Sequence, residues 1–156
     1  MKYYRVVISL CMVMFMGMLI LGHQYFGFGF NNTESLDNKV FFVEKNKIPK
    51  QGDFVVFKKN TNGILPDGTQ FIKKIAGISG DLVEHKNGKV YINYQALGEI
   101  KPNTQSGKSL QFGYVGIIPD EFYFAYTTHP RSFDSRYAQL GLIHENEIIG
   151  VATPLW

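Results

Sequence analysis

The sequence is short of cysteine, histidine and concentrated charge, and each shortage excludes a class of protein. Cys11 is the only cysteine, so the chain forms no intramolecular disulfide and no cysteine metal site. The four histidines are scattered and form no pair at the spacing of helical metal ligands, so no metal cofactor is expected. Lys and Arg number 16 against 13 Asp and Glu, a net charge of only +3. Without a block of like charges, nucleic-acid binding is not expected.

Beyond residue 30 the sequence also lacks helical periodicity, internal repeats and low-complexity segments. Short runs rich in Phe, Tyr, Val and Ile alternate with turn-forming residues, which predicts an all-β, mostly antiparallel domain. Asn87-Gly88 joins two such runs and predicts a type I′ hairpin turn. One short helix is predicted around Asp134–Leu140, within an otherwise irregular segment. The predicted strands are residues 39–43, 53–57, 70–75, 82–84, 90–92, 122–126 and 147–152.

One long apolar run is present, at the N-terminus. Residues 6–22 carry no charge and reach the lower limit of about 17 residues for crossing a bilayer. A cleaved signal peptide is the alternative, but the run exceeds the usual apolar core of about 7–15 residues, and Leu21-Gly22-His23 is a poor cleavage site. Lys2 and Arg5 precede the run and favour a cytoplasmic N-terminus. We therefore expect a transmembrane anchor at residues 1–30 and a β-rich domain at residues 31–156 on the far side.

The apolar run Phe71-Ile72-Lys73-Lys74-Ile75 is unusual because it contains two lysines. A serine hydroxyl becomes a nucleophile only beside a base. A lysine can serve as that base, because burial lowers its pKa by up to about 3–5 units. On a strand Lys73 shares a face with Phe71 and Ile75, which favours it over Lys74. The plain alternative is that both lysines are charges on an edge strand.

Two hydroxyl residues follow the apolar run at short distance. Ser35 would lie near a membrane surface, where a nucleophile suits a substrate held in the bilayer, although a serine in a polar connector is by itself ordinary. Thr33 places a hydroxyl where it can face an oxyanion beside the Ser35 backbone N–H. Asp134 and Arg136 by themselves predict a surface ion pair worth at most about 1 kcal/mol.

Taken together and in this order, several segments resemble the type I signal peptidases, membrane-anchored serine proteases with a Ser-Lys dyad. The most specific match is Ser132-Phe133-Asp134-Ser135-Arg136-Tyr137, which follows the strand-like run 118–124 and precedes Ile148-Ile149-Gly150. Residues 71–81 resemble the lysine block of the family, and residues 51–56 resemble its Gly-Asp-x-Val strand. The resemblance covers about residues 31–152.

The resemblance assigns roles that the residues alone do not. It implies that Ser35 is the nucleophile, Lys73 the general base and Ser132 the hydroxyl that orients the lysine. It further implies that Asp134 and Arg136 are structural supports, and Thr33 is a candidate oxyanion donor. The implied reaction is attack on the carbonyl that follows a small residue, with an acyl-enzyme intermediate and no cofactor.

Two departures from the housekeeping pattern point to a branch of the family. The chain has Ser35-Leu36-Asp37-Asn38 where those enzymes have Ser-Met-x-Pro-Thr, and residues 127–131 replace Gly-Asp-Asn-Arg. These features are similar to the conjugative-transfer (TraF-type) branch, whose members process pilin precursors and sometimes cyclise them. The resemblance thus implies a single-pass enzyme of the bacterial inner membrane that removes the leader of a secreted precursor in the periplasm. A pilin propeptide is the expected partner, and a general type I signal peptidase is the alternative.

Two other classes of protein stay open at this point. His129 and Asp134 lie in one irregular segment and could meet as part of a different serine hydrolase, although His129-Pro130 also indicates a simple turn. The domain could instead be an inert anchored scaffold for a pilus or secretion apparatus.

Overall fold

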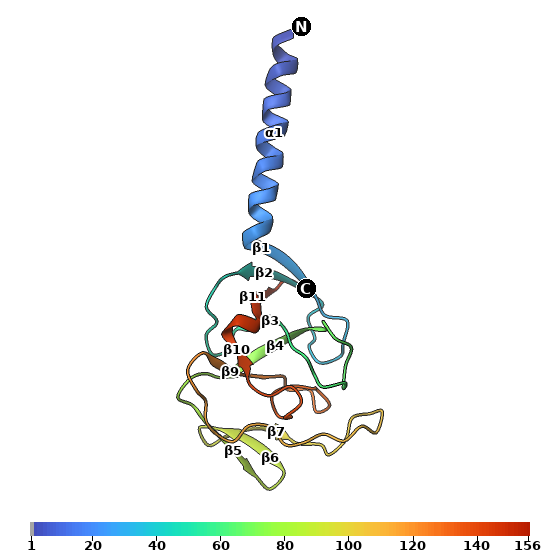
Figure 1. Ribbon diagram of the computed structural model, residues 1–156, viewed down its shortest axis with the longest axis vertical. Helices are drawn as coiled ribbons and strands as arrows, with labels where there is room; N and C mark the ends of the chain where they lie inside the picture. The colour runs from blue at the N-terminus through green and yellow to red at the C-terminus, as the bar shows by residue number, and fades with distance from the viewer. Residues whose placement is uncertain (1) are drawn as a thin grey trace.

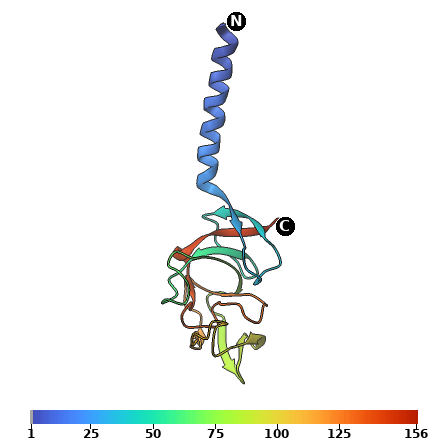
Figure 2. The same cartoon turned by 90° about the vertical axis from the view of Figure 1, so that its right-hand side faces the viewer.

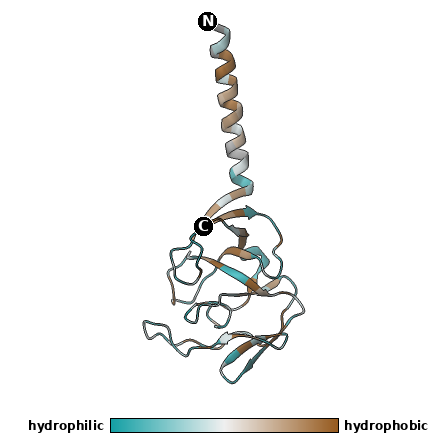
Figure 3. Cartoon of the chain, turned by 180° about the vertical axis from the view of Figure 1, so that it is seen from behind, coloured by the Kyte–Doolittle hydropathy of each residue, from teal (hydrophilic) through white to brown (hydrophobic). Residues whose placement is uncertain are grey.

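The computed structural model describes residues 2–156, which form one long helix and a β domain (Figure 1). The helix, α1 (Lys2–Tyr25), extends away from the β domain, and Figure 2 shows the same arrangement from the side. Its segment Val6–Tyr25 is 20 residues long and is apolar enough to cross a membrane. Figure 3 shows this apolar character along the helix. A membrane span and a signal sequence both have these properties.

The β domain consists of antiparallel strands, whose bounds are β1 (Phe26–Phe30), β2 (Val40–Lys45), β3 (Phe54–Lys58), β4 (Gln70–Gly77), β5 (Leu82–Lys86), β6 (Lys89–Ile92), β7 (Gln95–Glu99), β8 (Gly116–Ile117), β9 (Phe122–Tyr126), β10 (Ile143–His144) and β11 (Ile148–Pro154), with a 3-10 turn η1 (Glu145–Glu147) before the last. A seven-stranded sheet has the order β1-β2-β11-β3-β4-β9-β10. A four-stranded sheet has the order β7-β6-β5-β8 and lies at the end of the domain away from α1 (Figure 1).

All seven predicted strands are present, so the prediction of a mostly antiparallel β domain is confirmed. The predicted hairpin turn is also confirmed, because Asn87 and Gly88 both have positive φ, 50° and 71°. The predicted helix at Asp134–Leu140 is wrong. Its backbone groups bind neighbouring segments instead: Ser135 N–H donates to Ala125 O, and Ala138 N–H donates to Gln111 O.

Strand β1 is not among the predicted strands, and its residues fall inside the range expected for the anchor. It pairs with β2 along its whole length, from Phe26 opposite Glu44 to Phe30 opposite Val40. Its sequence alternates Phe and Gly, and Gly29 is the member pressed onto the sheet, where an added Cβ would lie 3.1 Å from Ile72 Cδ1. The strand therefore links the end of α1 to the sheet.

Strand β4 positions the lysine that the sequence singled out. It lies inside the sheet between β3 and β9, so the edge-strand alternative for its lysines is wrong. Phe71, Lys73 and Ile75 are buried on one face, whereas Lys74 is exposed on the other. Period-two alternation thus separates the two lysines as expected. Lys73 projects into the layer that holds the core residues Val55, Phe57, Phe71, Ile75, Tyr123, Ala125, Leu140 and Ile143.

Candidate active site

Ser35 lies on a closed loop, residues 31–39, between β1 and β2. Asn31 N–H donates to Lys39 O at 2.9 Å and joins the two ends of the loop. The buried Asn31 side chain ties the interior, because its Nδ2 donates to Leu36 O at 3.0 Å and to Asn38 O at 3.1 Å. The loop thereby presents Ser35 with little freedom to shift.

Lys73 reaches from β4 to two serines. Its Nζ lies 3.3 Å from Ser35 Oγ and 2.8 Å from Ser132 Oγ. Burial lowers the pKa of Lys73 from 10.5 to about 8, with the charge of Arg136 acting in the same direction and that of Asp134 opposing it. A lysine with this pKa is neutral in a usable fraction of molecules near neutral pH, as a general base must be.

Asp134 and Arg136 support the segment that carries Ser132. Arg136 Nε donates to Asp134 Oδ1 at 2.8 Å and Nη2 to Oδ2 at 2.8 Å. Both side chains are buried, so the expectation of a surface ion pair is wrong. Arg136 Nη2 also donates to Ser132 O at 3.0 Å. The guanidinium of this pair thus holds the backbone carbonyl of Ser132, the residue whose hydroxyl contacts Lys73.

Thr33 joins the same set of contacts from the other side. Its Oγ1 lies 2.7 Å from Ser35 Oγ and donates to Asn31 Oδ1 at 2.7 Å. The hydroxyls of Thr33, Ser35 and Ser132 and the amine of Lys73 therefore form one connected chain. Asn31 extends this hydrogen-bonded series at the Thr33 end, and it is the one member that the sequence did not single out. The spacing Asn-x-Thr-x-Ser is the signal that could have indicated it, since short polar side chains at alternate positions bind their own backbone.

The pair His129 and Asp134 does not form. His129 Nδ1 accepts from Arg131 N–H at 3.3 Å, while Asp134 accepts from Arg136 and from Thr127 N–H. Among the hydrogen bonds of residues 2–156, none joins His129 to Asp134. A serine hydrolase built on this histidine therefore has no support in the geometry.

A cleft of about 790 Å³ opens over Ser35 and Lys73. Its walls include the aromatic side chains of Phe30, Phe71 and Phe133. A second cleft of about 800 Å³ adjoins it, since Arg131, Ser132 and Phe133 line both. The two clefts together extend beyond the Ser35–Lys73 pair along the segment of residues 131–133.

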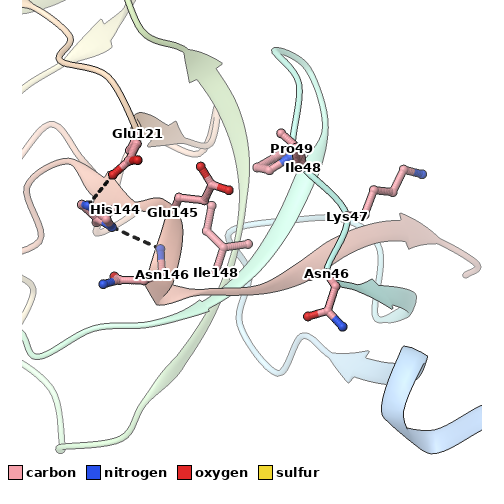
Figure 4. Close-up of a pocket in the computed structure, with 10 residues that line it drawn as sticks. Asn46, Lys47, Ile48, Pro49, Glu121, His144, Glu145, Asn146 and Ile148 are labelled. Atoms are coloured by element: carbon pink, nitrogen blue, oxygen red, sulfur yellow. Dashed lines mark hydrogen bonds and ion pairs between the residues drawn. The ribbon is translucent and has the colours of Figure 1, made fainter. Parts of the chain in front are cut away.

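A separate pocket of about 420 Å³ lies beside η1 (Figure 4). His144 on one side of this pocket contacts two neighbours: Nε2 lies 3.4 Å from Glu121 Oε2, and Nδ1 accepts from Asn146 N–H at 3.2 Å. None of the predicted site residues lines it. It contains no serine, cysteine or threonine, so it offers no hydroxyl or thiol nucleophile.

A serine hydroxyl within hydrogen-bond distance of a buried lysine, which also contacts a second hydroxyl, has the geometry of a site for nucleophilic catalysis without histidine. Comparison with known proteins agrees with this class. Residues 1–156 match the family described as signal peptidase, peptidase S26. The chain belongs to this family.

Individual relatives are signal peptidases I. Over 130 residues the chain is 28% identical to signal peptidase I P of Bacillus subtilis subsp. natto, covering 78% of this chain and 66% of that one. It is 32% identical over 111 residues to signal peptidase I S of Bacillus subtilis strain 168, covering 65% and 56%. A crystal structure of a signal peptidase I from Enterococcus faecalis V583 aligns with a TM-score of 0.44 and 23% identity, covering 69% of this chain and 98% of that one. The chain spans about half to two thirds of the length of these curated relatives.

Proposed function

We propose that this protein is a membrane-anchored serine endopeptidase that removes the leader of secreted precursor proteins. The observation that carries the proposal is the placement of Lys73 Nζ within 3.3 Å of Ser35 Oγ and 2.8 Å of Ser132 Oγ. Membership of the signal peptidase family supports the same activity and substrate class. The contacts support these roles in the proposal: Ser35 is the nucleophile, Lys73 the base, and Ser132 holds the lysine.

The reaction proceeds through an acyl-enzyme. Neutral Lys73 takes the Ser35 proton as Oγ attacks the carbonyl carbon of the scissile bond, and negative charge develops on the carbonyl oxygen. The backbone N–H of Ser35 itself is the proposed donor that stabilises this oxyanion. Lys73 then gives its proton to the leaving amine, and the C–N bond breaks. Water deprotonated by Lys73 releases the acyl group as a carboxylate and restores both residues.

The apolar helix α1 supports a reaction at a membrane surface. If α1 is a membrane anchor, β1 begins at the bilayer surface, and Phe30 at the end of β1 lines the cleft over Ser35. Lys2 and Arg5 favour a cytoplasmic N-terminus, so residues 31–156 form the peptidase domain on the outer side, the periplasm in a cell with two membranes. A leader peptide that is held in the bilayer can then reach Ser35 without leaving the bilayer.

A narrower proposal is that the substrate is a conjugative pilin, with cyclisation of the product in some cases. The segment Ser35-Leu36-Asp37-Asn38, without the Met-x-Pro of general enzymes, supports this proposal. The curated relatives, all named signal peptidase I, support the general activity instead. In a cyclising reaction the amine of the precursor itself, in place of water, would resolve the acyl-enzyme.

Intact-mass measurement of co-expressed precursors tests both proposals. Wild type, Ser35→Ala and the control Ser79→Ala are each expressed with general preproteins and with pilin precursors; Ser79 is an exposed serine that bonds Asp120 and lines neither cleft. We expect shortened products with wild type and Ser79→Ala only. Processing of pilins alone would support the dedicated role, and a product one water lighter than the linear chain would identify cyclisation. Equal processing by Ser35→Ala would exclude Ser35 as the nucleophile, and intact precursors throughout would favour an inert scaffold.

A further inference from the structure

We propose that Thr127 is a positioning residue whose hydroxyl accepts the third N–H of Lys73 and so favours the ammonium that forms when the lysine takes the Ser35 proton. The inference deepens the proposed function, because it rests on Lys73 as the base. It is carried by the place of Thr127 in the sheet and by a buried hydroxyl that lacks a partner.

Thr127 lies next to Lys73 across the strands β4 and β9. Lys74 is opposite Tyr126 in this antiparallel pair, so one step further along the strands brings Thr127 opposite Lys73. Ala125, two residues before Thr127, packs in the core layer into which Lys73 projects, and period-two alternation places Thr127 on that face as well. Directly opposed residues on one face have Cβ atoms about 4.5–5.5 Å apart.

The Thr127 hydroxyl is buried without a hydrogen bond. The residue is 3% exposed, and Oγ1 has no partner among residues 2–156. Burying an unpaired hydroxyl costs free energy, so such a group calls for an explanation. The backbone of Thr127 is held independently of the hydroxyl, because its N–H donates to Asp134 Oδ2 at 3.4 Å. Removing the hydroxyl therefore leaves this backbone bond in place.

The Lys73 amine has a complementary shortage of acceptors. Its described contacts are Ser132 Oγ at 2.8 Å and Ser35 Oγ at 3.3 Å. An ammonium group has three N–H donors, so one donor remains after these two contacts. On the same buried face, the Thr127 hydroxyl is an acceptor without a donor.

We expect this bond to form as positive charge develops on the lysine. Oγ1 has no partner in the resting structure, but a turn of Thr127 about χ1 between staggered positions aims the hydroxyl in a new direction. A hydrogen bond to a charged group contributes more than one to a neutral group. The contact therefore stabilises the ammonium over the amine, and it offsets part of the burial that lowers the pKa of Lys73.

Removing the hydroxyl should lower the pKa of Lys73 further. The other titratable or charged groups near Lys73 stay in place; these are Asp134 and Arg136, Tyr123 in the core layer, and Glu34, His129 and Arg131 in the cleft. A change in the Lys73 midpoint then reports the loss of the hydroxyl.

The test is the titration of Lys73 in the full chain in detergent micelles, followed by NMR of ¹³C-labelled lysine and assigned with Lys73→Arg. Thr127→Val removes the hydroxyl and keeps the shape of the side chain, whereas Thr127→Ser retains the hydroxyl. Thr128→Val is the matched control, because Thr128 is adjacent and exposed. We expect the Lys73 midpoint to fall by about one pH unit in Thr127→Val. It should stay unchanged in Thr127→Ser and Thr128→Val.

Cleavage of a precursor peptide gives a second readout. Because Lys73 becomes a weaker base, kcat in Thr127→Val should fall by about three- to tenfold with KM little changed, and the midpoint of kcat/KM should move down with that of Lys73. A residue that only packs would move neither midpoint. An unchanged or raised Lys73 midpoint in Thr127→Val would overturn the proposal. An unchanged midpoint with a higher Tm would identify the hydroxyl as an unpaired group with no part in the reaction.

A second variant and the choice of readout keep the inference testable by itself. Thr127→Cys replaces the hydroxyl with a weak acceptor of similar volume, and the Lys73 midpoint should fall in it even if Thr127→Val does not fold. The titration needs no substrate. A lowered midpoint in a chain that cleaves no precursor would contradict the proposed function and leave the contact of Thr127 with Lys73 standing. An unchanged midpoint in an active enzyme would contradict this inference alone.

Discussion

Lys73 lies closer to Ser132 than to its proposed partner in catalysis: its Nζ is 2.8 Å from Ser132 Oγ and 3.3 Å from Ser35 Oγ. The shorter contact is the buried one, and we expect it to hold the amine in place while the longer contact is remade during the proposed reaction. A displacement of about 1 Å at a reacting group can lower the rate by about 10²-fold.

We therefore predict that Ser132→Ala lowers kcat by about 10- to 100-fold with little change in KM. The measurement is steady-state cleavage of a precursor peptide by the full chain in detergent. Ser79→Ala is the control, because Ser79 is exposed and bonds Asp120 away from the site. A variant with unchanged kcat would show that Ser132 does not orient the lysine.

The buried charge of Lys73 should reduce stability at neutral pH. The folded pKa is lowered from 10.5 to about 8, so between these values the unfolded chain binds more protons and stability rises with pH. Below pH 8 the penalty is fully present, about 3 kcal/mol before the lysine hydrogen bonds are counted.

We predict that Lys73→Met abolishes cleavage yet raises the free energy of unfolding by about 1–2 kcal/mol at pH 7, since it removes the buried charge but leaves Ser132 without its partner. The gain should vanish near pH 10.5. Urea unfolding at both pH values measures it, with Lys74→Met on the exposed face of β4 as the control. A Lys73→Met protein less stable than wild type at pH 7 would contradict the account.

The ion pair of Asp134 with Arg136 should matter more than any exposed pair. Both side chains are buried, and Asp134→Asn leaves the guanidinium charge without its counterion. We expect a loss of about 3–5 kcal/mol in unfolding free energy. Glu99→Gln breaks the exposed pair with Lys101 and should change stability by less than about 1 kcal/mol. Comparable losses in the two variants, measured by thermal or urea unfolding, would show that the buried pair has no special role.

The strands were predictable because their apolar runs are bounded by turn residues, and β4 even revealed which lysine is buried. The conformation of the segment containing Asp134 and Arg136 was not predictable. It depends on side chains that bind backbone groups far away in the sequence, as Arg136 binds Glu99 O. The apolar Phe-Gly alternation of β1 was hidden by the adjoining helix. The importance of Asn31 arises from bonds within a loop, which no periodic pattern indicates.

The most direct test of the account is the pH dependence of kcat/KM for precursor cleavage, which reports the ionisation of the free enzyme. If neutral Lys73 is the base, kcat/KM should rise tenfold per pH unit at low pH and level off at about pH 8, in wild type and in His129→Ala alike. A midpoint near pH 6.5 that disappears in His129→Ala would identify a histidine base. That result would contradict the assignment of a Ser-Lys site.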